Sequence, residues 1–369
     1  MSKISRRPAT SRAPARRPVE LTTVRSPDRF PLETNLERLA GSRRLLIFMH
    51  DNPDPDALAA AHGLRLLVEH EVGAEVRLGL GGIVGRAENR AMVESLRIPL
   101  VPLEELVLSD FDRLAIVDSQ PGTGNNSLPP SRRVDIVVDH HPMRPESANA
   151  PWCDVRSELG ATSTIVLEYL RDRRIPIDSR LATALFYALR SETRDLGREA
   201  TDAERDAYLF LVPLVDHKAL SRISHPKVPR EHFTALDRAL RSARVWGEVV
   251  AANLGDLSYP DLVAEVADLL LSFDRAKFVL CGGRYGTRAF LSLRTDASEK
   301  RAGSLMRKII DTQGAAGGHG TMAGGRLHQP IENEAQMEKA FAQIVDRLLA
   351  EVAAPSQGPM PVPMPLVDR

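Results

Sequence analysis

Short apolar runs alternate with stretches of helical periodicity along the first half of the chain. The runs Leu45–Met49, Leu114–Val117 and Ile136–Val138 are short and each ends in polar residues, as expected of strands buried on both faces. Ala57–Glu71 and Thr162–Arg171 have apolar residues at helical spacing instead. A strand followed by a helix, repeated along the chain, predicts a parallel sheet covered on both faces, so we expect an α/β fold.

A second, smaller α/β pattern begins near Trp246. It predicts a strand at Glu248–Leu254 and a helix at Pro260–Ser272. Two strands, a helix, a glycine-rich turn and a last helix follow, at Lys277–Cys281, Arg288–Arg294, Ser304–Ile310, Gly317–Gly325 and Ile331–Val352. We therefore predict a parallel-sheet domain at residues 33–202, a mainly helical connector at 203–245 and a smaller α/β domain at 246–353.

The two ends of the chain differ in composition from the rest. The first 30 residues contain eight Lys or Arg and only two Asp or Glu, and they lack the apolar segment of a secretory signal. Residues 354–369 contain five prolines. We expect residues 1–32 to be a flexible basic tail, and residues 354–369 to be a Pro-rich tail that is extended and unpacked.

The overall composition excludes several classes of protein. Of the 369 residues, 43% are apolar and 27% are charged, which is an ordinary globular balance. Lys and Arg number 49, as do Asp and Glu, so bulk positive charge does not hold this protein to nucleic acid. No apolar stretch reaches the roughly 18 residues that cross a bilayer. Cys153 and Cys281 lie far apart and form no C-x-x-C pair, which argues against a disulfide framework or a zinc ribbon and favours a cytoplasmic protein.

Polar side chains gather where three predicted strands end. The first strand ends in His50-Asp51-Asn52-Pro53-Asp54-Pro55-Asp56, the second in Asp118 and the third in Asp139-His140-His141. The carboxyl ends of parallel strands lie on one edge of a sheet, which is where ligands bind in open α/β folds. We therefore expect these carboxylates and imidazoles to meet in one crevice.

So many acidic side chains need a counter-charge, which a bound cation would supply. Carboxylates with a minority of imidazoles favour a divalent ion such as Mn²⁺ over structural zinc, which usually has thiolate ligands. His50, Asp54, Asp56, Asp118 and His140 are enough ligands for two ions, an arrangement suited to hydrolysis of phosphate esters. Taken singly, each acid could be a turn former or a helix cap, Asp56 above all. Taken together, they favour a metal site in which Asp118 bridges two ions.

These segments resemble the motifs of the DHH phosphoesterase family, which includes RecJ-type exonucleases, nanoRNases and pAp phosphatases. His50-x-Asn52-Pro53-Asp54-x-Asp56-Ala57 resembles the first motif, Asp118 the second, and Asp139-His140-His141 the eponymous triplet. The C-terminal unit resembles the DHH-associated substrate-binding domain, marked by Ser292-Leu293-Arg294 and Gly317-Gly318-His319-Gly320. Three departures stand out, since Pro55 replaces a usual Gly, Gly320 a preferred Pro, and Glu192 the Asp of the fourth motif.

The resemblance implies two Mn²⁺ ions, with Mg²⁺ or Co²⁺ as substitutes. Two ligand sets that share one carboxylate are implied: His50, Asp54 and Asp118 for one ion, and Asp118, Asp56, His140 and the fourth-motif acid for the other. That acid is Glu192 by register, with Asp195, three residues later, as the alternative.

The resemblance also implies roles in catalysis and substrate binding. Asp118 and His140 belong to the catalytic centre, His141 contacts the substrate phosphate, and Asp139 orients a neighbouring histidine. In the second domain, the implied substrate-binding residues are Arg294, Gly317, Gly318 and His319, because glycines let a ligand approach the backbone and the two side chains can bind phosphate or a base.

The expected fold is thus α/β, with a parallel-sheet N-terminal DHH domain and a smaller α/β C-terminal substrate-binding domain. The expected function is Mn²⁺-dependent hydrolysis of short nucleotide substrates, namely oligoribonucleotides, linear dinucleotides or pAp. The competing functions are those of a cyclic-dinucleotide phosphodiesterase and of a catalytically weak nucleotide-binding protein, the latter suggested by Glu192 at an Asp position. No membrane partner is expected, and a homodimer is left open.

Overall fold

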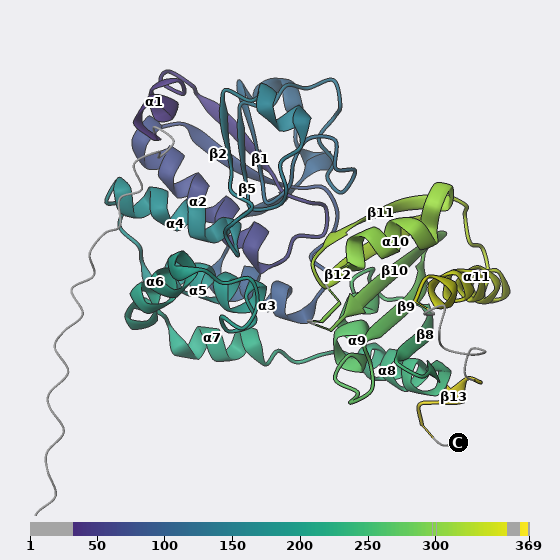
Figure 1. Ribbon diagram of the computed structural model, residues 1–369. Helices are drawn as coiled ribbons and strands as arrows, with labels where there is room; N and C mark the ends of the chain where they lie inside the picture. Colours follow the sequence, from purple (N-terminus) through teal and green to yellow (C-terminus); the bar gives the residue numbers. More distant parts are fainter. Residues whose placement is uncertain (1–31, 297, 300, 353–361, 368–369) are drawn as a thin grey trace, which may run out of the picture.

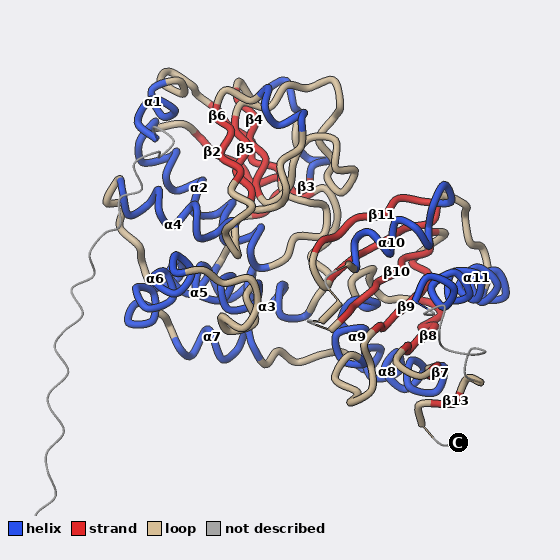
Figure 2. Tube along the Cα trace, in the orientation of Figure 1, coloured by secondary structure: helices blue, strands red, loops and turns tan. Residues whose placement is uncertain are grey.

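The computed structural model describes residues 32–296, 298–299, 301–352 and 362–367, which form two α/β domains (Figures 1 and 2). The first domain contains a six-stranded sheet in the order β3-β2-β1-β4-β5-β6, in which every neighbouring pair is parallel. Its strands are β1 Arg44–Phe48, β2 Glu75–Leu80, β3 Leu100–Pro102, β4 Arg113–Val117, β5 Ile136–Asp139 and β6 Trp152–Val155. The predicted parallel sheet is confirmed.

Both faces of this sheet are covered, as the apolar strands require. One face is covered by seven of the described helices, which share a core with the strands. These helices are α1 Leu32–Glu37, α2 Pro55–Val72, α3 Ala87–Leu96, α4 Thr162–Asp172, α5 Ser179–Glu192, α6 Asp202–Leu211 and α7 His217–Ser224. The opposite face carries Phe48 and Ile116, which pack with apolar residues of the two short 3₁₀ turns Leu103–Glu105 and Leu108–Asp110 and with Phe111. No helix among the described residues is long and apolar enough to cross a membrane.

The second domain contains a mixed sheet in the order β11-β12-β10-β9-β8-β7-β13, in which only β8 and β9 run parallel among the described strands. Its strands are β7 Arg244–Trp246, β8 Val249–Asp256, β9 Phe278–Tyr285, β10 Arg288–Thr295, β11 Gly314–His319, β12 Met322–Leu327 and β13 Met364–Pro365. Helices α8 Arg230–Ser242 and α9 Leu262–Leu270 cover one face, and α10 Ala302–Ile310 and α11 Glu334–Val352 cover the other. The smaller α/β unit is confirmed.

The glycine-rich segment differs from the expected turn, because it forms the antiparallel hairpin of β11 and β12. Its glycines allow the backbones to pack closely. A Cβ on Gly318 would lie 2.3 Å from the carbonyl oxygen of Met322, and a Cβ on Gly325 would lie 2.1 Å from Ile310 Cδ1. The segment is therefore part of the sheet, and its glycines are explained by packing as well as by ligand access.

The expectation of an unpacked C-terminal tail is wrong for its described part. Met364 and Pro365 form β13, which pairs antiparallel with β7, and the Leu366 N–H donates to the carbonyl oxygen of Ala243 at 3.2 Å. Proline is tolerated on such an edge strand because its missing N–H can face away from the ladder. The basic tail falls on residues 1–31, which lie outside the described residues.

A partly buried carboxyl group in the second domain makes stability depend on pH. Burial raises the pKa of Glu265 to about 7, although its Oε2 accepts a hydrogen bond from Tyr259 Oη at 2.9 Å. The charged form is disfavoured in the folded chain. The contribution of this group to stability is therefore fully present below about pH 4.5 and is lost as the pH rises through about 7.

We expect Glu265→Gln to remove most of the loss of stability at higher pH, because an amide keeps the hydrogen-bond acceptor for Tyr259 but cannot become charged. Near pH 8 the variant should be about 1–3 kcal/mol more stable than the wild type, and near pH 4.5 the two should agree. Thermal unfolding at both pH values measures the difference. Equal stabilisation at both values would contradict the ionisation argument.

Candidate metal centre

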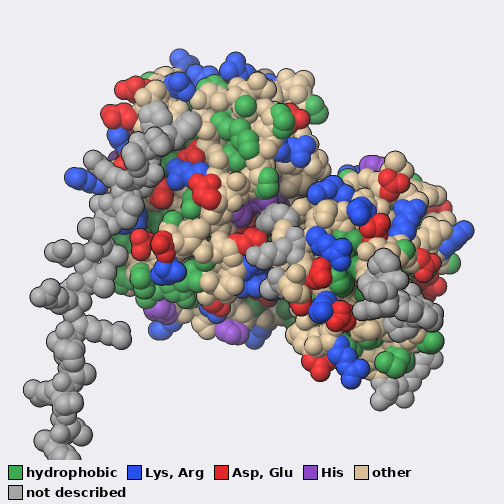
Figure 3. All heavy atoms as spheres, in the orientation of Figure 1, with side chains coloured by type: hydrophobic (Ala, Val, Ile, Leu, Met, Phe, Trp, Pro, Cys, Tyr) green, Lys and Arg blue, Asp and Glu red, His purple; other side chains and the backbone are tan. Residues whose placement is uncertain are grey.

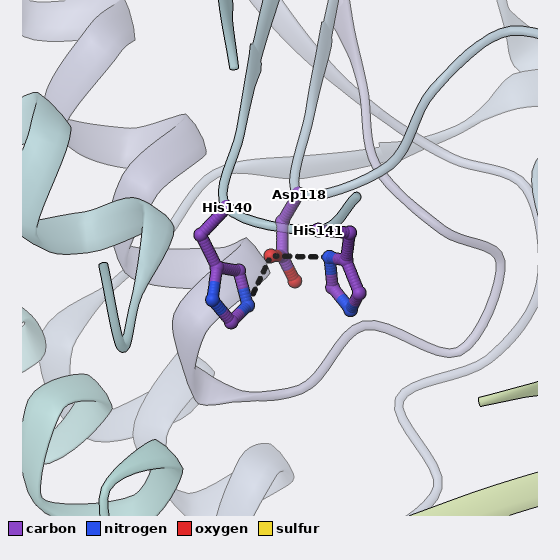
Figure 4. A group of neighbouring side chains, drawn as sticks. All are labelled: Asp118, His140 and His141. Carbon is purple, nitrogen blue, oxygen red and sulfur yellow. Dashed lines mark ion pairs between the residues drawn. The ribbon is translucent and has the colours of Figure 1, made fainter. Parts of the chain in front are cut away.

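The three polar strand ends meet at one edge of the first sheet, as the parallel order predicts. Strand β4, which Asp118 follows, lies between β1 and β5, so Asp118 stands between His50 and His140. Its Oδ2 lies 3.7 Å from His50 Nε2 and its Oδ1 lies 3.6 Å from His140 Nε2. Figure 4 shows Asp118 between the imidazoles of His140 and His141. Asp118 is thus the centre of the group.

The surroundings of Asp118 are costly for a carboxylate without a cation. The residue is 3% exposed, and burial together with the charges of Asp56, Asp54, Asp139 and Glu192 raises its pKa well above the usual range. Its backbone φ is +53°, in the left-handed region where a non-glycine residue carries strain on the order of 1 kcal/mol. Strain and charge concentration at one residue are typical of a functional site.

One ligand group forms where α2 begins. Asp54 caps this helix, because its Oδ1 accepts the N–H groups of Asp56 and Ala57 at 2.9 and 3.0 Å. Its Oδ2 lies 3.8 Å from His50 Nε2. The helix cap is therefore Asp54 and not Asp56, and the cap presents its second oxygen to the site.

A second group forms against the start of α4. Asp56 is buried, and its two oxygens accept the N–H groups of Thr162 at 2.7 Å and Ser163 at 2.9 Å. The positive end of a helix thus holds this carboxylate. Asp56 Oδ2 lies 3.9 Å from His140 Nε2, and His140 Nδ1 lies 3.3 Å from the carbonyl oxygen of Leu159. A donor bond from Nδ1 to that oxygen would leave Nε2 as the ligand atom.

The described residues contain two tight clusters of candidate ligand atoms, each within 4.8 Å, and Asp118 belongs to both. One cluster is His50, Asp54 and Asp118, and the other is Asp118, His140 and His141. Carboxylate oxygens with imidazole nitrogens suit Mn²⁺ or a similar divalent ion. The chemistry of the donors therefore fits a divalent metal ion at Asp118.

His141 differs from the other two histidines because it is tied to a buried carboxylate. Its Nδ1 lies 2.8 Å from Asp139 Oδ1. Burial lowers its pKa, but the hydrogen bond and charge of Asp139 outweigh burial and raise the pKa to about 9. With Nδ1 held by Asp139, the opposite ring nitrogen of His141 is suited to donate to an anionic substrate group.

The two candidates for the fourth motif have different surroundings. Glu192, at the end of α5, is partly buried, and its Oε1 lies 3.3 Å from Arg198 Nη2. Burial and the charge of Asp54 raise its pKa. Asp195 is exposed and pairs with Arg190 at 2.7 Å. The geometry favours Glu192, although neither acid belongs to the two tight clusters.

The match to known proteins begins with this part of the chain. Residues 44–189 match the DHH family, N-terminal domain. These residues thus form a domain of the DHH superfamily. Its similarity to an uncharacterized protein of Methanocaldococcus jannaschii is 31% identity over 307 residues, which cover 83% of this chain and 62% of that protein. A probable manganese-dependent inorganic pyrophosphatase of Deinococcus radiodurans is 32% identical over 177 residues, which cover 46% of this chain and 54% of that protein.

The chain thus spans between 54% and 62% of the length of these two curated relatives. Among solved structures, an exopolyphosphatase-related protein from Bacteroides fragilis is similar over 86% of this chain and 94% of its own, with a TM-score of 0.65 and 14% identity. That likeness concerns the fold.

Basic and acidic side chains lie together at the junction of the two domains (Figure 3). Arg294 is 7% exposed, and its Nε donates to Asp268 Oδ1 at 2.7 Å. Arg194 and Arg86 from the first domain lie 3.3 and 3.6 Å from the same carboxylate. Arg294 is therefore engaged in a cluster of three arginines around one acid, which the sequence did not predict. Its substrate-binding role stays a prediction.

The glycines predicted to bind substrate lie in the hairpin. Gly317 pairs with Gly324 across β11 and β12. A Cβ on Gly317 would meet nothing within 4 Å, and a Cβ on Gly324 would meet only the carbonyl oxygen of Leu291 at 4.0 Å. Gly318 is packed instead, and the side chain of His319 lies outside the described residues. Gly317 and Gly324 thus form a bare backbone patch.

Several residues of the site had no role assigned to them from the sequence. Thr162 Oγ1 donates to Asp118 Oδ1 at 2.8 Å, and Arg198 donates from Nη1 to Met322 Sδ at 2.9 Å as well as facing Glu192. Gln120 donates to Asp139 at 2.7 Å. Only Thr162 had a signal, because a hydroxyl residue after Gly160-Ala161 at a helix start is a common anion-binding position.

Proposed function

We propose that this chain is a metal-dependent hydrolase of phosphoester bonds in short nucleotides, such as oligoribonucleotides, linear dinucleotides or pAp. The observation that carries the proposal is the buried Asp118 carboxylate between His50 with Asp54 on one side and His140 with Asp56 on the other. The name of the Deinococcus relative supports manganese as the metal.

Two ions held by His50, Asp54, Asp56, Asp118 and His140 would activate a water and polarise phosphoryl oxygens. Other residues of the chain hold the ligand carboxylates in place. Thr162 holds the Asp118 carboxylate and the start of α4 holds Asp56, so the ligands are oriented before a substrate arrives.

His141 would bind the substrate phosphate. Its pKa of about 9 makes the imidazole a cation at neutral pH, and Nδ1 is occupied by Asp139. The opposite ring nitrogen can then donate a charge-assisted hydrogen bond to a phosphoryl oxygen, where negative charge grows during the reaction.

The second domain supports a substrate that carries a base. In the bare backbone patch of Gly317 and Gly324 no side chain of the described residues covers the main chain. A planar base can therefore lie close to the backbone there. Arg86, Arg194 and Arg294 meet around Asp268, and guanidinium groups of this kind suit a second phosphate.

A second candidate substrate is inorganic pyrophosphate, because relatives that match part of this chain are named as probable manganese-dependent inorganic pyrophosphatases. Against it, those relatives match 41–46% of this chain, and the second domain offers the patch described above. A cyclic-dinucleotide phosphodiesterase and a catalytically weak nucleotide-binding protein would differ from both candidates in what they hydrolyse or bind.

The test is a substrate panel with Mn²⁺: di- to pentanucleotides, pAp, a cyclic dinucleotide, pyrophosphate and polyphosphate. We expect the highest kcat/KM on linear nucleotides, and loss of turnover with EDTA and in Asp118→Asn. Asp195→Asn serves as the matched control, since it removes an exposed acid near the site. Pyrophosphate as the fastest substrate would replace the proposal by the second candidate, and nucleotide binding without turnover would make the chain a binding protein.

A further inference from the structure

Gln120 is a buried amide that lies two residues after Asp118 and is 1% exposed. Its side chain uses its full hydrogen-bonding capacity. Nε2 donates to Asp139 Oδ2 at 2.7 Å and to the carbonyl oxygen of Pro142 at 3.1 Å. Oε1 accepts the N–H of Arg144 at 2.7 Å and the hydroxyl of Ser147 at 2.8 Å. Because a backbone N–H can only donate, the Arg144 contact identifies the acceptor end, and the NH₂ group must face Asp139.

Asp139 is held equally firmly on its other side. Its Oδ1 lies 2.8 Å from the N–H of His140, 3.2 Å from the N–H of His141 and 2.8 Å from His141 Nδ1. Asp139 is 1% exposed, so this carboxylate is shielded from solvent and held by these contacts. The direction of its Oδ1, and with it the plane of the His141 ring, depends on what holds Oδ2.

We propose that Gln120 is a positioning residue that sets the His141 ring through Asp139. The chain of contacts runs from Gln120 Nε2 to Asp139 Oδ2, and from Asp139 Oδ1 to His141 Nδ1. The inference rests on the proposed function, in which His141 binds the substrate phosphate. It adds the residue that fixes how that histidine is presented.

The chemistry of an amide suits this place. A Lys or Arg at position 120 would also hold Asp139, but it would add a positive charge close to carboxylates that are to bind cations. The amide supplies a donor to Asp139 without a net charge. The amide therefore orients the Asp139 carboxylate without neutralising it, and the negative charge of Asp139 remains available to interact with His141.

The same amide also ties the segment around Ser147 to the end of β4, and that tie is a purely structural role. Two substitutions separate the roles. Gln120→Glu keeps the acceptor for Arg144 and Ser147 and replaces the amide donor to Asp139 by a carboxyl group, which has no proton to donate when it is ionised. Ser147→Ala removes one bond of the tie and leaves the contact with Asp139 in place. Gln120→Met removes both sets of contacts and serves as the second variant if Gln120→Glu does not fold.

The first measurement needs no turnover. In the metal-free full chain, NMR of ¹⁵N-labelled histidines detects the Nδ1–H of His141, assigned by its loss in His141→Gln. We expect this resonance to shift or broaden beyond detection in Gln120→Glu and Gln120→Met, and to be retained in Ser147→Ala. An unchanged resonance in both Gln120 variants overturns the proposal.

The second measurement is kinetic, on a phosphoester that the wild type hydrolyses. We expect kcat to fall about 10–100-fold in the Gln120 variants, as for outer partners of metal-site residues, while Mn²⁺ affinity by calorimetry changes less than about threefold. An equal fall in Ser147→Ala would assign Gln120 to the structural tie and overturn the proposal. If the wild type hydrolyses none of the substrates while the resonance responds as expected, the positioning role stands and the proposed function fails.

Discussion

Asp118→Asn is expected to abolish turnover and to change stability in opposite directions with and without Mn²⁺. Loss of outer partners of a metal site costs about 10–100-fold, so loss of the ligand shared by both clusters should cost more than about 100-fold. In the metal-free chain the same substitution removes a buried charge that other carboxylates repel. The metal-free variant should therefore be about 1–2 kcal/mol more stable than the wild type, which corresponds to a few degrees in Tm.

Thermal unfolding in EDTA and in saturating Mn²⁺ measures the stability change of the variant without and with metal. The steady-state rate measures turnover. Without metal, Asp118→Asn should have the higher Tm, and with metal the wild type should, because only the wild type gains the full binding energy. Asp195→Asn provides the control and should match the wild type in both conditions. A variant that is less stable in EDTA, or that retains near-wild-type turnover, contradicts the central role of Asp118.

Glu192→Gln is expected to weaken Mn²⁺ binding and reduce turnover by at least about tenfold, whereas Asp195→Asn changes neither beyond about twofold. Glu192 is partly buried and lies near enough to Asp118 and Asp54 to affect their charge states. Asp195 is 60% exposed in its side chain and is paired with Arg190. Each substitution removes one charge with little change in shape. A difference between the two variants therefore reports which of the two positions binds the metal.

Calorimetric titration with Mn²⁺ gives the affinity and the number of ions bound for each variant. Arg198→Gln is a further probe, because Arg198 pairs with Glu192 at 3.3 Å and competes with a cation for that carboxylate. The Arg198→Gln variant should therefore bind Mn²⁺ more tightly than the wild type. A loss of affinity confined to Asp195→Asn would transfer the ligand role to Asp195, and no change in either acid would remove the fourth motif from the metal site.

The features predicted from the sequence were those encoded locally. Apolar runs that end in Asp118 or in His140 identify strands and their polar ends, and the geometry of parallel sheets then places those ends together. The contacts of Gln120 and Arg294 could not be predicted this way, since their partners lie 19 and 26 residues away in sequence and on other elements. The glycine-rich hairpin was interpreted as a turn because glycine lacks the β-branched signal of strands.

The positions of Asp54 and Asp56 on α2 have a consequence for which ions the site can accept. Asp54 caps this helix and Asp56 lies in its first turn, while the helix itself is buried against the core from Ala57 to Leu64. These two carboxylates cannot move apart without displacing a helix packed on the sheet. Ligands held on one packed helix adapt poorly to Ca²⁺, which requires oxygen ligands at about 2.3–2.6 Å and a flexible shell of about six to eight of them. The apolar packing of α2 would thus act as the size filter of the site, although none of its core residues touches an ion.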